Sequence, residues 1–341
     1  MPVPLRLIEA FFEGDKGNLK GQIKEDLGIE NIQEYTIGNS CMLRILIDSG
    51  DSQKVIDALE ARLKNEKDFG IVILPAEGSV PKIETSEINA KSKVDEEEIP
   101  VWKQPFRKGT SISREELYTD IADTVSLSPI QLVMVVLSAI VAAIGLIRDS
   151  SVVLIGAMVI APMLGPNVAM SFSICLGDFD LFLKALKANL LRIFVAFFFS
   201  FIIGFFIDLS SLSQEILSRT ILHISDILLA LSAGTAAALS YTTAVSEGFI
   251  GVMVAVALLP PLTASGLLLS SGYIEYGLSA LGLFLLNIVC INFATMITFF
   301  LQDIRPKKWW ELEKAKGALK KAFLLWSIML SIMALIVIFL F

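Results

Sequence analysis

Two pairs of prolines lie inside long apolar stretches, and they are the residues with the clearest potential for binding chemistry. The first pair is Pro162 and Pro166, and the second is Pro260 and Pro261. Proline has no amide proton and its ring crowds the carbonyl four residues back, so each pair is expected to interrupt a helix. Carbonyl and amide groups freed inside a membrane must face protein, water or a solute, because hydrocarbon forms no hydrogen bonds. We therefore predict a binding site at two paired broken helices.

Small and polar residues beside the prolines would complete this site. The N-termini of half-helices suit an anion, whereas unwound carbonyls suit a cation. The predicted substrate or ion pathway consists of Pro162, Gly165, Pro166, Asn167, Pro260, Pro261, Thr263 and Ser265. The alternative is that both segments are kinked helices that small residues help to pack, without a ligand.

Residues that would support an enzyme or a metal centre are scarce. The three cysteines, Cys41, Cys175 and Cys290, lie far apart, and His223 is the single histidine. A zinc site, haem ligation or a Ser-His-Asp triad cannot be assembled from this set. The net charge of −7 argues against a generally basic face for nucleic acid. We expect no enzyme activity, no catalytic residues, no metal, no cofactor and no nucleic-acid partner.

The composition is that of a multi-pass membrane protein with a soluble piece attached. Of 341 residues, 54% are hydrophobic and only 18% are charged. The mean hydropathy is +0.69. A span needs roughly 20 helical residues to cross about 30 Å of hydrocarbon. This criterion predicts seven spans, near residues 128–147, 151–176, 190–208, 224–243, 249–271, 278–301 and 321–341.

The distribution of basic residues predicts the orientation, because cytoplasmic loops are enriched in Lys and Arg. With a cytoplasmic N-terminus, the opposite loops carry only Arg148 and Arg219. The cytoplasmic loops then carry Lys184, Lys187, Arg192, Arg305, Lys307, Lys308, Lys314, Lys316, Lys320 and Lys321. We expect a multi-pass protein of the cell membrane with a cytoplasmic N-terminus. Acidic residues fall at or near span ends, which disfavours a proton or sodium pump with a carboxylate in mid-membrane.

An internal repeat divides the apolar region into two halves. Under a shift of 95 residues, the matched pairs include Ile155 and Ile250, Pro166 and Pro261, Gly177 and Gly272, and Arg192 and Asn287. Each half contains three predicted spans, an odd number, so the two copies must enter the bilayer from opposite faces. This predicts an inverted-topology repeat, and in known transporter folds the substrate site lies where such units meet.

The N-terminal region predicts a soluble α+β domain. Short apolar runs and apolar residues at helical spacing indicate strand, helix, strand, strand, helix and strand in that order. The predicted strands are residues 5–12, 32–37, 42–47 and 69–74. The first predicted helix carries Leu19, Ile23 and Leu27 and ends at Gly28, and the second is capped by Asp51 or Ser52 and carries Val55, Ile56, Leu59 and Leu63. This order is typical of the ferredoxin-like (βαββαβ) fold. The fold by itself names no ligand.

One part of the apolar region resembles a known family. Residues 145–150 (GLIRDS) and 153–166 (VLIGAMVIAPMLGP) look like the signature of a prokaryotic membrane family, domain of unknown function 389. The segment Ala257–Pro261, with Gly266, is similar to that family's second characteristic stretch. The resemblance covers roughly residues 128–300. It implies a polytopic protein of bacteria or archaea, and it carries over no binding or catalytic residue.

Together these features predict an α-helical multi-pass membrane protein with two inverted three-helix repeats and an N-terminal ferredoxin-like soluble domain. The predicted division is a cytoplasmic ferredoxin-like domain at 1–80, a linker at 81–112, an amphipathic surface helix at 113–126, membrane repeats at 128–208 and 222–302, and a basic cytoplasmic loop with a final transmembrane helix at 303–341. The helix at 113–126 could instead pack on the first domain as a soluble helix.

We expect a membrane transporter or channel for a small solute or ion, embedded in the lipid bilayer. Its cytoplasmic domain would regulate transport by binding a small-molecule effector, and the protein would form homo-oligomers. The alternative function is a membrane-embedded sensor or scaffold, whose soluble domain binds a ligand and whose spans contain no transport pathway.

Overall fold

The structure is a computed structural model in two compact units, Met1–Tyr118 and Thr119–Phe341. The described residues are 5–13, 19–29, 31–37, 40–48, 51–63, 69–76, 113–207, 209, 212–243, 247–304 and 309–340. The predicted linker at 81–112 and part of the predicted basic loop, at 305–308, lie outside the described residues.

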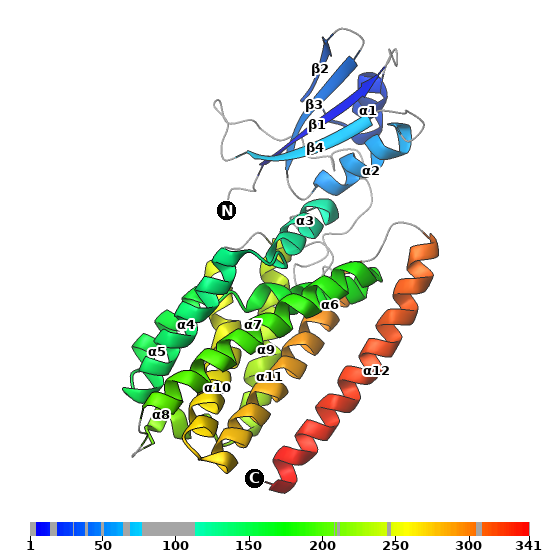
Figure 1. The fold of residues 1–341 in the computed structure, drawn as a ribbon. Coiled ribbons are helices and arrows are strands. Elements are labelled where there is room, and N and C mark those ends of the chain that lie inside the picture. Colours follow the sequence, from blue (N-terminus) through cyan, green and yellow to red (C-terminus); the bar gives the residue numbers. More distant parts are fainter. Residues whose placement is uncertain are drawn as a thin grey trace, which may run out of the picture. The chain divides into compact units, whose positions relative to one another are not determined.

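The N-terminal unit contains a four-stranded antiparallel sheet with strand order β2-β3-β1-β4. Figure 1 shows α1 and α2 together beside this sheet. The elements are β1 (Leu5–Glu13), α1 (Leu19–Leu27), β2 (Ile32–Ile37), β3 (Ser40–Asp48), α2 (Ser52–Leu63) and β4 (Phe69–Ala76). They follow one another in the order that the apolar periodicity predicts.

The core of this unit follows from alternation along the strands. Ile8, Ala10 and Phe12 of β1 are buried, whereas Phe11 between them is 39% exposed. Successive side chains of a strand point to opposite faces, so one face of the sheet is apolar and covered. The buried residues of α2 recur at helical spacing, at Val55, Ile56, Leu59 and Leu63. The helices therefore cover the apolar face of the sheet.

Helix α3 (Arg114–Thr124) begins at a capping residue, because the amide of Glu116 donates to Ser113 Oγ at 3.2 Å. Its first turn is bound to the N-terminal domain. Glu116 forms an ion pair with Arg6 at 2.8 Å, and the amide of Arg114 donates to Gln53 Oε1 at 2.8 Å.

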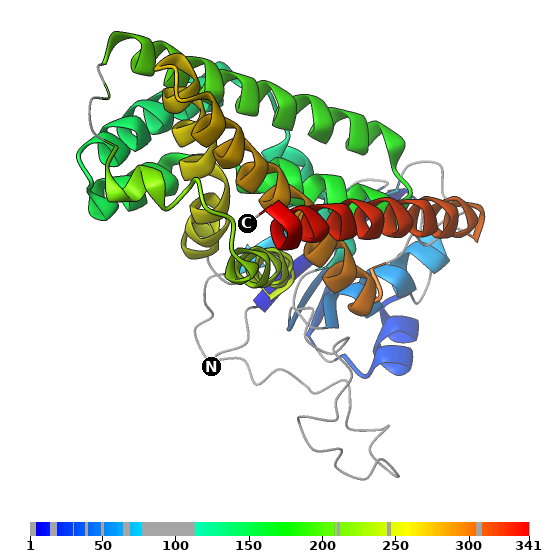
Figure 2. The same cartoon turned by 90° about the horizontal axis from the view of Figure 1, so that it is seen from below.

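The second unit is a bundle of helices (Figure 1). Figure 2 shows α7 running along one edge of this bundle. Helix α12 packs against α6 and α11. The helices are α4 (Pro129–Ile147), α5 (Ser151–Ile160), α6 (Leu164–Leu176), α7 (Phe179–Phe206), α8 (Gln214–Leu217), α9 (Ile224–Thr243), α10 (Glu247–Ser270), α11 (Ile274–Leu301) and α12 (Trp309–Leu340).

Four helices among the described residues, α4, α7, α9 and α11, are long and apolar enough to cross a membrane. Helices α5 and α6 meet at an angle of 51° and would form a fifth span if they count as one broken span. The chain is therefore a mostly helical membrane protein with four to five candidate spans. The two other predicted spans fall on α10 and α12, and they remain predictions.

One predicted span, at 190–208, falls on a longer helix. Helix α7 begins at Phe179 rather than at residue 190, and Arg192 lies in its middle with 2% of its surface exposed. Arg192 is therefore not a loop residue, as the orientation count assumed. Lys184 and Lys187 lower the hydropathy of the first half of α7, so a reading by hydropathy places that half in a loop.

The prediction of a second broken helix is also wrong. Helix α10 runs without interruption through Pro260 and Pro261. Pro261 has no amide to donate to the carbonyl of Ala257, four residues back. The side-chain amide of Asn287, on α11, donates to this carbonyl at 2.6 Å. A partner from the neighbouring helix thus satisfies the freed group, and the helix continues.

Candidate functional site

The first proline pair does interrupt a helix, at Ala161–Met163 between α5 and α6. The last turn of α5 closes with the Ala161 amide on Ala157 O at 3.2 Å, and Met163 caps α6 without a side-chain hydrogen bond. The carbonyl of Pro162 is left outside both helices. The residue four positions later, Pro166, has no amide with which to reach it.

Arg192 satisfies this freed carbonyl. Its Nη1 donates to Pro162 O at 2.6 Å. Its Nη2 donates to Thr124 O at 2.9 Å, to Ser126 O at 3.5 Å and to Gln131 Oε1 at 2.5 Å. One buried guanidinium thus joins the break to the end of α3 and the start of α4. All four acceptors are uncharged.

The second copy of the predicted repeat contains a similar bond at the corresponding position. Asn287 is separated from Ala257 by 30 residues, as Arg192 is from Pro162. Both donors and both acceptors are related by the shift of 95 residues, since 287 − 192 and 257 − 162 are each 95. In each copy the third helix therefore donates a side-chain hydrogen bond to the carbonyl that the second proline leaves without an amide.

Helix boundaries follow the same shift. Helices α7 and α11 both contain 28 residues and begin at Phe179 and Ile274, which are 95 positions apart. Left-handed glycines, Gly177 with φ 70° and Gly272 with φ 86°, precede them. In both copies the next amide donates at 2.9 Å to the carbonyl five residues back. This local match does not depend on apolar composition, which any two spans share.

A buried cluster of amides lies beside the break. Asn167 Oδ1, on α6, accepts from Asn189 Nδ2 at 2.9 Å and from Asn292 Nδ2 at 3.1 Å. Ser171, one turn later on α6, donates to the backbone carbonyl of Asn292 at 3.0 Å. The cluster joins α6 and α7 of the first copy to α11 of the second. Buried polar groups of this kind fix one arrangement of the helices when all are hydrogen-bonded.

The polar residues of the second proline segment have other partners. Ser265 Oγ donates to Gly277 O at 2.9 Å, on α11. Thr263 is fully buried, and its Oγ1 has no partner among the described residues. Within the part of the chain that the structure describes, no hydrogen bond joins residues 162–167 to residues 260–265. The structure thus brings the first segment to α7 and α11, and the second segment to α11.

Close helix packing accounts for several small residues. A Cβ added to Gly165 would lie 2.4 Å from the Cβ of Thr124. Helices α7 and α10 also approach each other closely. A Cβ added to Gly204, on α7, would lie 2.2 Å from Ser270 Oγ, and a Cβ added to Gly266, on α10, would lie 2.8 Å from Ser200 Cβ. Small residues four apart are typical of close contacts between transmembrane helices. Because Gly165 has no side chain, the first turn of α6 can pack against the end of α3.

Sequence reasoning missed Arg192, Gln131 and Asn189 as members of the site. Arg192 was counted with the loops, and Asn189 lies just outside the predicted span at 190–208. Gln131 is a single polar residue in an apolar run, where such residues are common. The available signal was the alignment of Arg192 with Asn287, because two donors at one position of a repeat indicate a shared acceptor.

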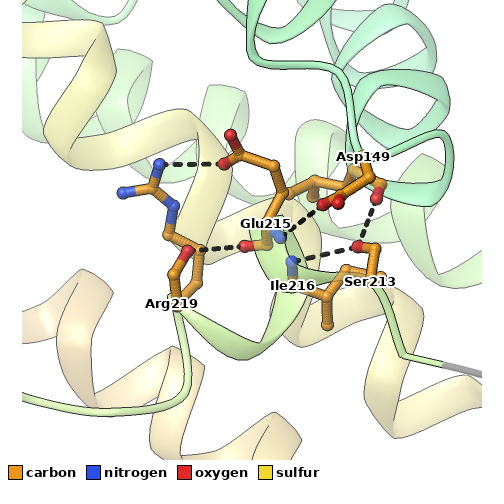
Figure 3. A network of polar contacts seen from close by, with 7 residues as sticks. Asp149, Ser213, Glu215, Ile216 and Arg219 are labelled. Carbon is orange, nitrogen blue, oxygen red and sulfur yellow. Dashed lines mark hydrogen bonds and ion pairs between the residues drawn. The ribbon is translucent and has the colours of Figure 1, made fainter.

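The opposite end of the bundle carries a different polar network, drawn in Figure 3. Ser213 Oγ donates to Leu146 O at 2.5 Å, and the amide of Glu215 donates to Asp149 Oδ1 at 2.8 Å. Arg219 lies 3.4 Å from the carboxylate of Glu215. These contacts attach the end of α4 to α8, which leads into α9.

Comparisons with known proteins identify the family. Residues 158–293 match the family described as "Domain of unknown function (DUF389)". An uncharacterized protein of Methanocaldococcus jannaschii is 36% identical over 321 residues, which cover 91% of this chain and 95% of that protein. No solved structure matches the chain. The chain belongs to the DUF389 family.

Proposed function

We propose that the protein is a membrane transporter or channel for a small solute or ion, with its site at the break between α5 and α6. The observation that carries this proposal is the bond from Arg192 to Pro162 O, in the interior of the helical unit. A buried, charged side chain inside a membrane protein is costly, and such residues mark solute or ion pathways. Non-helical backbone in a span is tolerated where it is buried in protein or lines a cavity.

The two copies of the repeat are proposed to have inverted topology. Ser213, just before α8, bonds Leu146 O, so α4 ends at the end of the bundle where α9 begins. Ser271, just after α10, donates to Gly204 O near the end of α7 at 3.1 Å, so α7 ends where α11 begins. Equivalent helices thus run in opposite directions. In inverted repeats of this kind, the substrate site lies where the two units meet.

The proposed site differs from two paired broken helices. Pro162, Gly165, Pro166 and Asn167 stay in it, because they form the break and the first turn of α6. The second copy contributes α11, through Asn292, rather than a second break. The uninterrupted α10 packs against α7 and α11, the helices that carry Asn189 and Asn292.

The N-terminal unit is proposed to be a ferredoxin-like regulatory domain on the cytoplasmic side of the cell membrane. Its element order and its strand order, β2-β3-β1-β4, support this assignment. A small-molecule effector and assembly into homo-oligomers complete the proposal. Lys184 and Lys187, in the first half of α7, support the orientation.

Flux assays test the function directly. The full chain is reconstituted into liposomes, and uptake of a panel of inorganic ions, carboxylates, sugars and amino acids is compared with that of protein-free vesicles. We expect at least one solute to cross, and its flux to fall in Asn167→Leu but not in the matched control Gly156→Ala, whose added Cβ would meet nothing within 4 Å. Absence of flux for the whole panel, together with ligand binding by the N-terminal unit, would instead support a sensor.

A further inference from the structure

The charge around the break is unbalanced. Arg192 is 2% exposed, and its acceptors are three backbone carbonyls and one side-chain amide. Among the residues that the structure describes, no carboxylate lies within ion-pair distance of it. Its Nε has no partner there either. A buried cation without a counter-charge costs several kcal/mol, even when its hydrogen bonds are satisfied.

A second source of positive potential points at the same place. Helix α6 has 13 residues, and its N-terminus begins at Met163, directly after the carbonyl that Arg192 binds. The N-cap side chain accepts no hydrogen bond from the first turn. The partial charge at a helix N-terminus is about +0.5, whereas the C-terminal ends of α3 and α5, which also lie at the break, carry about −0.5 each. The guanidinium charge is therefore only partly offset by the helix dipoles.

The second copy lacks both features. Its donor is the neutral Asn287, and α10 continues through the prolines, so it presents no helix N-terminus at the equivalent position. Between the two proline segments, as far as the structure describes them, the combination of a buried charge and a helix N-terminus therefore occurs in the first copy.

We propose that the break binds a small anion, such as a halide, an inorganic oxyanion or a short carboxylate, and that this anion is the species that the protein moves. The inference rests on the proposed function for transport, but binding can be tested without transport. An anion at the start of α6 would offset both the dipole and the charge of Arg192, whose Nε–H has no partner among the described residues.

The binding test uses the purified full chain in detergent. Thermal unfolding is followed while the sodium salt of chloride, nitrate, phosphate, sulfate or acetate replaces sodium gluconate at constant ionic strength. A ligand that binds only the folded state raises the Tm saturably. We expect such a rise for at least one anion with the unmodified chain and with Arg219→Gln, which removes a positive charge outside the site. The rise is lost in Arg192→Gln and retained in part in Arg192→Lys. A Tm of the unmodified chain that no anion raises beyond gluconate overturns the proposal.

The transport arm separates this inference from the proposed function. In liposomes, we expect anion flux that falls about tenfold or more in Arg192→Gln, since a charge-assisted contact is worth about that factor in affinity. Flux of cations or neutral solutes alone leaves transport standing and overturns the anion site. Saturable anion binding without any flux leaves the site standing and overturns transport.

Discussion

Arg192 Nη1 lies 2.6 Å from the carbonyl oxygen of Pro162. In a continuous helix the amide of residue 166 would donate to this oxygen, but Pro166 has no amide proton. The same relationship, at the same 2.6 Å, joins Asn287 to Ala257 in the second copy. One copy breaks and the other does not, although both freed carbonyls have a side-chain donor. The difference lies in the spacing of the prolines: Pro260 and Pro261 are adjacent and remove amides from one turn, whereas Pro162 and Pro166 act at two successive turns.

The continuity of α10 is predicted to depend on Asn287. Replacing Asn287 by Leu leaves Ala257 O buried without a donor, which should cost about 1–3 kcal/mol of unfolding free energy. Pro261→Ala restores an amide at the position that can reach this carbonyl, so the cost of Asn287→Leu should shrink in that background. Chemical denaturation in detergent micelles measures the resulting double-mutant cycle.

The control for this cycle is Ser279→Ala, at a half-buried position of the same helix where the hydroxyl donates to Glu275 O of its own helix. This change should alter stability by less than about 0.5 kcal/mol. An equal cost of Asn287→Leu with proline and with alanine at position 261 would show that the side chain does not replace the missing amide.

The first turn of α6 is predicted to tolerate no side chain at Gly165. Its Cβ would lie 2.4 Å from Thr124 Cβ, so Gly165→Ala should destabilise the protein by about 1–3 kcal/mol through overpacking. Gly156→Ala, on α5, makes no such contact and should be neutral or stabilising by up to about 1 kcal/mol. Thermal unfolding of the two variants decides the matter; a Gly165→Ala variant as stable as Gly156→Ala would contradict the close approach.

The amide cluster is predicted to act as a unit. Asn167→Leu removes the acceptor shared by Asn189 and Asn292 and should cost about 1–3 kcal/mol. Asn167→Leu combined with Asn292→Leu should cost less than the sum of the two changes, because the second no longer breaks their common bond. Thr235→Val, which removes a bond to a carbonyl of its own helix, is the control. Additive costs would mean that the shared bond contributes nothing.

Local patterns predicted the elements of the N-terminal domain because each depends on neighbours in the chain. The apolar run from Leu5 to Phe12 marks β1, and the helical spacing of Val55 and Leu59 marks α2. The shift of 95 residues that relates Gly177 to Gly272 could also be read from the sequence, and both glycines have positive φ. Each of these sequence patterns lies within a few residues of the element that it predicts.

The errors concern features that depend on distant residues. The donor for the carbonyl that Pro261 leaves without an amide is Asn287, which belongs to another helix. The burial of Arg192 depends on oxygen atoms from Thr124, Gln131 and Pro162, which three separate segments supply. A hydropathy window averages such a residue with its neighbours and places it at the surface.

Access to the break tests the central claim most directly. Met163, the N-cap of α6, and Val135, in the middle of α4, are each replaced by cysteine in a chain whose Cys41, Cys175 and Cys290 are changed to alanine. Reconstituted protein is exposed to a small, charged, membrane-impermeant thiol reagent. The account predicts that Met163→Cys is modified, while Val135→Cys stays unreactive over the same period. A cysteine at 163 that reacts no faster than one at 135, from either side of the membrane, would contradict passage of a solute through this break.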